Sequence, residues 1–357
     1  MIINKFLAST AICSALAVSS VSFAQESPKA GTVEAGSLSG QTVVFASSGG
    51  IFQDGQKEAI WDPFARESGA TVLQDTSSFA RLRAGVESGT IAWDMSVSGR
   101  YQTYQFCGTL WERIDTSIVD LSQVPEGLVT DECMIPAIVY GDIGAYNADL
   151  WPEAPQNWAD FFDVEKFPGK RGLNMSADPS VAVVIAALLA DGVAPDDLYP
   201  IDFDRAFAKL RSIDEHIVAW STGAQSQQQL ESGEVAMAQV WSGRGYGAAA
   251  AGTNIQPIWD DWVIAVDSVG IPKGAPNVAA AQAGLNYYLG AEQTARLAEL
   301  TSYGAVNINA EPNLEPLVSE WVPNAERLGR GVNPDIAWWS ENWDEFADHW
   351  SDWITGN

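Results

Sequence analysis

Residues 41–50 of this 357-residue chain are Gln41-Thr-Val-Val-Phe-Ala-Ser-Ser-Gly-Gly50. The first six are rich in β-branched and aromatic residues and predict a strand, whereas the small residues after them predict a turn. Apolar residues then recur at Ile60, Trp61 and Phe64, with the spacing of a helix that faces a core. This part of the chain is therefore predicted to form a strand, a glycine-containing turn and a helix.

A second unit of the same kind follows directly. Residues 70–73 predict a strand, residues 75–78 a turn, and Leu82 and Val86 a helix, before residues 93–97 predict a third strand. Alternation of short strands with helices is typical of parallel βαβ units and hence of an open α/β sheet. Ligands of such sheets bind in a crevice at the carboxyl ends of the strands, where these turns would lie.

The rest of the chain continues this alternation. Further helices are predicted at residues 181–189, 203–213, 278–289 and 291–300, and further strands near residues 216–219 and 235–240. A chain of this length exceeds what one hydrophobic core usually organises, and no low-complexity linker interrupts it. We therefore expect two α/β lobes that are connected by short crossings of the chain.

The N-terminal residues have the features of an export signal. Lys5 precedes an apolar stretch over residues 6–21, and residues 22–24, Ser-Phe-Ala, fit the small-x-small rule for cleavage. A membrane anchor is the alternative, but serine and threonine interrupt the stretch, which is shorter than the roughly 20 residues that cross a bilayer. We predict that residues 1–24 are a cleaved signal peptide and that the mature protein is periplasmic.

The charge of the chain argues against polyanionic partners. Lysine and arginine number 19 against 46 aspartates and glutamates, which gives a formal net charge of −27. Such a field repels nucleic acid and anionic membrane surfaces. Acidity spread along the whole chain indicates solubility and does not identify a pocket.

Two cysteines, Cys107 and Cys133, remain after the predicted cleavage. An even pair in an exported chain predicts a disulfide, which would contribute about 3 kcal/mol in the chain-entropy model. The alternative is a catalytic thiol, which would need a histidine partner. The chain has only His216 and His349 to provide one.

Common catalytic and cofactor motifs are missing. The sequence contains no HExxH, GxxxxGK[ST], CxxC or GxSxG pattern, so we expect no metal, no cofactor and no enzymatic activity. The glycines of residues 243–247 resemble a dinucleotide loop only in part. An exported hydrolase that uses two of the many acids remains the alternative from another functional class.

Polar and charged residues on loops suit the reversible binding of a small hydrophilic solute. Arg244 and Asp267 are the two charged candidates. An arginine can bind a carboxylate through a bidentate fork, and an aspartate in a partly desolvated cleft can pair with an ammonium group. Each could instead belong to a structural ion pair.

A series of short motifs occurs in order along the chain. The motifs are Ser47-Ser-Gly-Gly50, Asn157-Trp-Ala-Asp-Phe-Phe162, Phe167-Pro-Gly-Lys-Arg171, Ala187-Leu-Leu-Ala-Asp-Gly192, Leu198-Tyr-Pro200, Gly223-Ala-Gln-Ser226, Ser232-Gly-Glu234, Trp241-Ser-Gly-Arg244 and Ile271-Pro-Lys-Gly-Ala-Pro-Asn277. This series resembles the extracellular solute-binding proteins of polyamine-type ABC importers. Each motif is weak alone, but their number and order are specific. The resemblance runs from about Gln41 to the C-terminus.

The resemblance implies the type II periplasmic binding protein fold, in which two α/β lobes surround a central ligand cleft. One lobe would comprise residues 41–140 plus 272–330 and the other residues 141–271, with hinge crossings near Gly141 and Val269. The tryptophan-rich tail, residues 331–357, would pack across the lobes. The implied partners are a small amine or zwitterionic solute and the membrane permease of the importer, and we expect a monomer.

The resemblance also implies site residues. Asp267 matches a carboxylate that holds an ammonium group in polyamine-binding relatives, and Tyr101 and Trp241 match aromatic residues that clamp the methylene chain. Asp178 matches a carboxylate for the distal amine. Val181 stands where those relatives have a second acid, which argues against a polyamine ligand.

Arg244 is a second departure from the polyamine pattern. It resembles the arginine of family members that bind ω-amino acids such as γ-aminobutyrate, with one arginine for the carboxylate and one aspartate for the amine. An ω-amino acid is therefore the favoured ligand, with a polyamine or a carbohydrate as alternatives. Further ligand contacts are expected from Ser48, Gly49, Ser98, Gln225 and Trp339.

Overall fold

The computed structural model describes residues 27–125, 127–129 and 131–356, and its strands form one sheet. The predicted signal peptide lies outside the described residues. The order of the strands is β2-β1-β3-β8-β4-β7-β5-β6. Their bounds are β1 Thr42–Ser47, β2 Thr71–Thr76, β3 Met95–Gly99, β4 Met134–Asn147, β5 Arg171–Asn174, β6 Ile217–Trp220, β7 Met237–Trp241 and β8 Ile255–Gly270.

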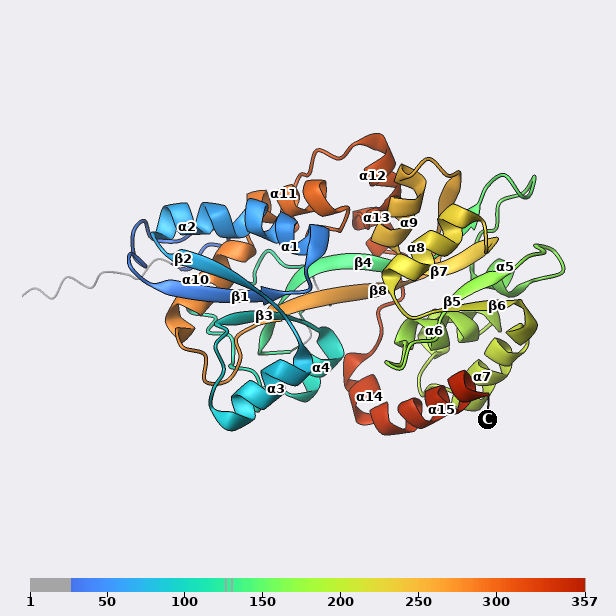
Figure 1. Ribbon diagram of the computed structural model, residues 1–357, viewed down its shortest axis with the longest axis horizontal. Coiled ribbons are helices and arrows are strands. Elements are labelled where there is room, and N and C mark those ends of the chain that lie inside the picture. Colours follow the sequence, from blue (N-terminus) through green and yellow to red (C-terminus); the bar gives the residue numbers. More distant parts are fainter. Residues whose placement is uncertain (1–26, 126, 130, 357) are drawn as a thin grey trace, which may run out of the picture.

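Helices flank this sheet (Figure 1). They are α1 Gly50–Gln56, α2 Asp62–Ser68, α3 Phe79–Ser88, α4 Arg100–Gln105, α5 Trp158–Phe162, α6 Val181–Ala190, α7 Phe203–Arg211, α8 Gly223–Ser232, α9 Ser242–Ala250, α10 Val278–Tyr288, α11 Ala291–Thr301, α12 Pro316–Trp321, α13 Ala325–Leu328, α14 Ile336–Glu341 and α15 Trp343–Thr355. A π-helical turn, Lys57–Trp61, joins α1 to α2. None of the described helices is long and apolar enough to cross a bilayer.

The predicted α/β architecture is confirmed. Strand β1 pairs in parallel with both β2 and β3, as βαβ units require. Strand β5 pairs in parallel with β6 and β7 in the other half of the sheet. Helices α6, α7, α10 and α11 begin at the residues that the sequence predicts. Side-chain caps fix the start of several helices: Ser78 accepts a hydrogen bond from the Arg81 N–H at the start of α3.

Two long antiparallel strands, β4 and β8, form the middle of the sheet. They contain 14 and 16 residues and pair along most of their length. Strand β8 bonds to β3 at one end, and β4 bonds to β7 at the other. The same two strands therefore run through both halves of the molecule (Figure 1). Their pairing is irregular between Pro136 and Ile138 and between Asp142 and Gly144.

The buried apolar residues form two large clusters. One surrounds β1, β4, β8 and α10, and the other surrounds α6 and α7. Helix α6 is buried at every position, as expected for a helix that is apolar all round. The tail belongs to the second cluster through Trp339, Phe346, Trp350 and Trp353. Helix α14 also lies against α4 in the other half. The first residue of α15, Trp343, reaches the same helix, with its ring 5.8 Å from that of Tyr101.

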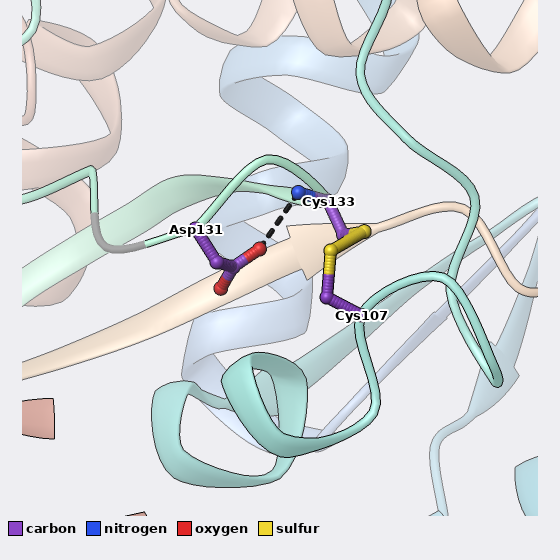
Figure 2. Close-up of side chains that lie close together, drawn as sticks. All are labelled: Cys107, Asp131 and Cys133. Atoms are coloured by element: carbon purple, nitrogen blue, oxygen red, sulfur yellow. Dashed lines mark hydrogen bonds between the residues drawn. A yellow bond between two sulfur atoms is a disulfide. The ribbon is translucent and has the colours of Figure 1, made fainter. Parts of the chain in front are cut away.

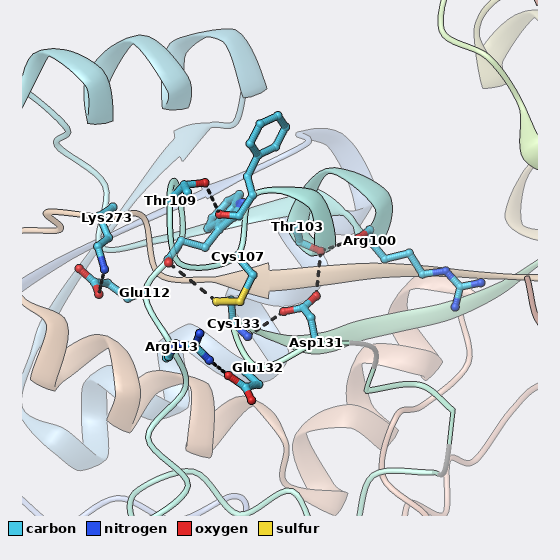
Figure 3. The surroundings of a disulfide bond; sticks show 12 residues. Arg100, Thr103, Cys107, Thr109, Glu112, Arg113, Asp131, Glu132, Cys133 and Lys273 are labelled. Carbon is cyan, nitrogen blue, oxygen red and sulfur yellow. Dashed lines mark hydrogen bonds and ion pairs between the residues drawn. A yellow bond between two sulfur atoms is a disulfide. The ribbon is translucent and has the colours of Figure 1, made fainter. Parts of the chain in front are cut away.

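The predicted disulfide between Cys107 and Cys133 is present (Figure 2). It joins the residues just after α4 to the start of β4. Asp131 accepts hydrogen bonds from the Cys133 N–H at 2.7 Å and from the Thr103 hydroxyl at 3.4 Å. The Thr103 hydroxyl is also 2.8 Å from the carbonyl oxygen of Arg100, so this network fixes α4 (Figure 3). The cysteines lie near Asp131, but sulfurs bonded to each other are not thiolate ligands for a metal.

Candidate ligand-binding site

A cavity of about 320 Å³ lies over the middle of the sheet. Its floor includes Tyr140 and Asp142 of β4 and Ala265 and Asp267 of β8. These residues alternate along their strands, and alternate residues of a strand lie on the same face. The walls come from the start of α4, the segment between β5 and α6, and the ends of β6 and β7, so both halves of the sheet contribute.

Asp267 is a partly buried carboxylate in this cavity. Desolvation raises its pKa to about 6, although the hydroxyl of Tyr140, 3.4 Å away, opposes the increase by donating a hydrogen bond. In the part of the chain that the structure describes, Asp267 forms no ion pair. A desolvated carboxylate without a cation favours a ligand that brings a positive charge.

Asp142 is a second carboxylate in the cavity and was not among the site residues predicted from the sequence. Its side chain is 5% exposed and accepts a hydrogen bond from the amide nitrogen of Gln239. The oxygen of the same amide accepts from the backbone N–H of Asn174 at 3.1 Å, which fixes its orientation. Burial raises the pKa of Asp142 to about 7. The sequence did contain a sign of this residue's importance, because an acid inside the apolar stretch of residues 134–147 is unusual.

Arg100 is a buried cation that was also not predicted from the sequence. It is the first residue of α4, lines the cavity and is 2% exposed. Its guanidinium donates to the carbonyl oxygen of Ile264 at 3.0 Å and to Oδ1 of Asn333 at 3.2 Å. Both acceptors are neutral, and within the described residues no carboxylate forms an ion pair with Arg100.

Arg244 lies in α9 beside the cavity and not in its lining. Its Nε atom is buried and has no hydrogen-bond partner among the described residues. Burial raises the pKa of Tyr303, the charge of Asp267 raises it further, and the charge of Arg244 lowers it. The charges of Arg244 and Asp267 therefore both act on the Tyr303 hydroxyl. Gly223 makes room for the arginine, since a Cβ there would be 2.7 Å from Arg244 Nε.

Of the predicted aromatic contacts, Tyr101 and Trp241 line the cavity. The ring of Trp241 packs edge-on against Trp220, with centroids 5.7 Å apart, and Trp220 lines the cavity as well. Trp339 lies elsewhere: it is fully buried, and its indole N–H donates to the Tyr199 hydroxyl at 2.8 Å.

The remaining predicted residues lie in different places. Asp178 lines the cavity and is exposed. Ser48 and Gly49 follow β1 and Ser98 lies in β3, outside the cavity lining. Gln225 is the third residue of α8, where its side-chain oxygen accepts from the backbone N–H groups of residues 221 and 222 in a capping box. The structure thus brings together Tyr101, Asp178, Trp241 and Asp267.

Comparison with known proteins identifies the family. Residues 59–326 match the model of the bacterial extracellular solute-binding protein family. The γ-aminobutyric acid-binding protein of Pseudomonas aeruginosa is 31% identical over 323 residues, which are 88% of this chain and 91% of that protein. The spermidine/putrescine-binding periplasmic protein of Escherichia coli is 24% identical over 76% of this chain and 81% of its own length.

A solved structure is also similar. A GABA receptor superimposes with a TM-score of 0.80 at 35% identity, over 88% of this chain and 98% of that chain. The chain therefore belongs to the bacterial extracellular solute-binding protein family and is a substrate-binding receptor of an ABC importer.

Proposed function

We propose that this receptor captures a small ω-amino acid, with γ-aminobutyrate as the favoured ligand. The main support for this proposal is Asp267. Its carboxylate is desolvated, lines the cavity and has no cationic partner among the described residues, so it is suited to bind the ammonium group of the ligand. Tyr101 and Trp241 then enclose the methylene chain, and cation–π contact with each ring contributes about 0.5–2 kcal/mol.

Arg244 binds the carboxylate of the same ligand. Its buried Nε atom lacks a hydrogen-bond partner among the described residues, and a buried donor that is left unpaired costs free energy. Tyr303 lies within the electrostatic influence of both Arg244 and Asp267, which supports their cooperation on one short zwitterion. Two relatives named for γ-aminobutyrate, at 31% and 35% identity, agree with this ligand class.

Closure of two lobes accompanies binding. In this proposal the lobes are residues 41–140 plus 272–330 and residues 141–271, and β4 and β8 carry the hinge near Gly141 and Val269. The continuity of both strands through the sheet supports this arrangement. Closure brings Arg244 to the cavity and removes the ligand from water, which strengthens both charge interactions.

The receptor works in the periplasm as a monomer, releases its ligand unchanged and delivers it to a membrane permease. Family members are receptors, which supports a role without turnover. Incubation with γ-aminobutyrate, polyamines and oligosaccharides, followed by chromatography, tests this directly. If the protein converts any of these compounds, and one carboxylate substitution abolishes the conversion, the protein is a hydrolase.

Titration calorimetry of the mature protein tests the ligand class. We expect γ-aminobutyrate to bind, and Asp267→Asn and Arg244→Gln each to weaken binding by about tenfold or more, because each removes a charge-assisted contact. Asp260→Asn is the matched control, since Asp260 is an exposed acid on the same strand. Binding of putrescine that survives Arg244→Gln, or of a sugar without charge dependence, would overturn the proposal.

A further inference from the structure

Arg100 and Asp142 are charged groups in the cavity that an ω-amino acid leaves unused. They are 2% and 5% exposed, and both line the cavity. Neither forms an ion pair with any residue in the described part of the chain. Buried charges in proteins are usually paired, because desolvation of an isolated charge is costly. A guanidinium and a carboxyl group that line one cavity without ion-pair partners therefore indicate a ligand that brings the complementary charges.

The surroundings of Asp142 are built to hold it in place. The amide of Gln239 donates to one carboxylate oxygen and is itself oriented by the backbone of Asn174. Ser176 and Ser221 line the same cavity and add hydroxyl groups on its walls. Arg100 is fixed equally firmly by the carbonyl oxygen of Ile264 on β8. This part of the cavity is therefore polar, preorganised and provided with one charge of each sign.

The strand register gives the separation, along the sheet, of the two floor positions that carry carboxylates, Asp142 and Asp267. Asp142 pairs with Val263, and Asp267 follows four positions later on β8. At about 3.3 Å per residue the two positions are roughly 13 Å apart along the strand. A chain of six bonds between two nitrogens spans roughly 7–8 Å. Two ammonium–carboxylate contacts of about 2.8 Å each complete that separation.

We propose that Arg100 and Asp142 form a second subsite, which binds the α-amino carboxylate head of a basic amino acid whose terminal ammonium group reaches Asp267. Arg100 takes the carboxylate, Asp142 the α-ammonium and Asp267 the distal ammonium. Of the proposed function, this inference relies only on the binding of an ammonium group by Asp267. A diamine lacks the carboxylate for Arg100, and an ω-amino acid lacks the second ammonium for Asp142.

Three probes that differ by one charged group each provide the test. L-Lysine carries all three groups, 6-aminohexanoate lacks the α-ammonium, and cadaverine lacks the carboxylate. Titration calorimetry at pH 8 measures each against the wild-type protein, Asp142→Asn and the control Asp260→Asn. Asp142→Asn keeps the size of the side chain and can still accept from Gln239. Circular dichroism and urea unfolding verify that each variant is folded.

We expect lysine to bind the wild type and Asp260→Asn at least about tenfold more tightly than either smaller probe, since each missing group removes a charge-assisted contact. In Asp142→Asn the preference for lysine over 6-aminohexanoate should fall to about threefold or less. An equal loss for both probes would make Asp142 a structural residue and refute the subsite.

The remaining outcomes separate this inference from the proposed function. If γ-aminobutyrate binds through Asp267 but lysine binds no more tightly than 6-aminohexanoate, the subsite is refuted and the ω-amino acid receptor stands. Cadaverine binding more tightly than lysine would refute the role of Arg100. Failure of every amine to bind would refute both proposals.

Discussion

Replacing Asp267 with asparagine should stabilise the ligand-free protein at neutral and alkaline pH. Burial raises the pKa of this carboxyl to about 6 from its ordinary 3.8, so the folded state holds the proton more tightly than the unfolded chain does. The contribution of this carboxyl group to the free energy of unfolding is therefore fully present below about pH 4 and is lost as the pH rises through about 6. Asparagine does not ionise and avoids that loss.

The size of the effect follows from the two pKa values. The difference between about 6 and 3.8 corresponds to roughly 3 kcal/mol at pH 8 and about 0.5 kcal/mol at pH 4. Because the carboxylate is only partly buried and faces the cavity, we expect about 1–3 kcal/mol at pH 8. Asp142 also has a raised pKa, but it is present in both proteins and cancels from the comparison.

Urea unfolding of wild type and Asp267→Asn between pH 4 and pH 8, without ligand, measures this difference. The variant should gain stability relative to wild type as the pH rises, whereas Asp260→Asn, an exposed acid on β8, should show no such trend. Saturating γ-aminobutyrate, at 100 times its dissociation constant, should stabilise wild type by about 2.7 kcal/mol and the variant by far less. A variant that is less stable than wild type at pH 8 would refute the desolvation argument.

Three further outcomes can be measured with the same methods. Replacing Cys107 and Cys133 with serine should cost about 3 kcal/mol in urea unfolding and weaken ligand binding, because the disulfide fixes α4; unchanged affinity would contradict the link to the site. Tyr140→Phe removes the hydroxyl that donates to Asp267, so the pKa of that carboxyl should rise further and γ-aminobutyrate affinity should fall more at pH 6 than at pH 8 in calorimetry. Trp339→Ala should cost about 3–5 kcal/mol of stability with little change in ligand affinity, since its ring is fully buried away from the cavity; a large loss of affinity in a folded variant would return this residue to the site.

The sequence predicted the α/β class and the first βαβ units because the decisive signals are local, whereas strands β4, β5 and β8 were not predicted. The β-branched stretch of residues 41–46, the small turn after it and the helical spacing of Ile60 and Trp61 lie next to one another in the chain. They predicted β1 and the helices after it to within a few residues. The disulfide was equally accessible, because only two cysteines remain after the predicted cleavage.

Local signals identified the candidate site less completely. Asp267, Tyr101 and Trp241, which the family resemblance predicts to contact the ligand, line the cavity. Gln225 was expected to contact the ligand from a loop end, yet its side chain caps α8, and the threonine three positions before it was a local sign of that role. A motif match reports which residue type is present and does not report which neighbour the side chain meets.

The sequence alone was enough to predict the α/β class, the first βαβ units, the disulfide and the kinds of charge that are available. It did not predict β4 and β8, the two long strands whose pairing decides which charges meet in one cavity. Arg100 and Asp142 are distant in sequence and lie on different elements, and the pairing of β4 with β8 places Asp142 on the same floor as Asp267. The physical reason is that the face a strand residue occupies changes with every residue, so the register between distant strands decides which side chains reach the ligand.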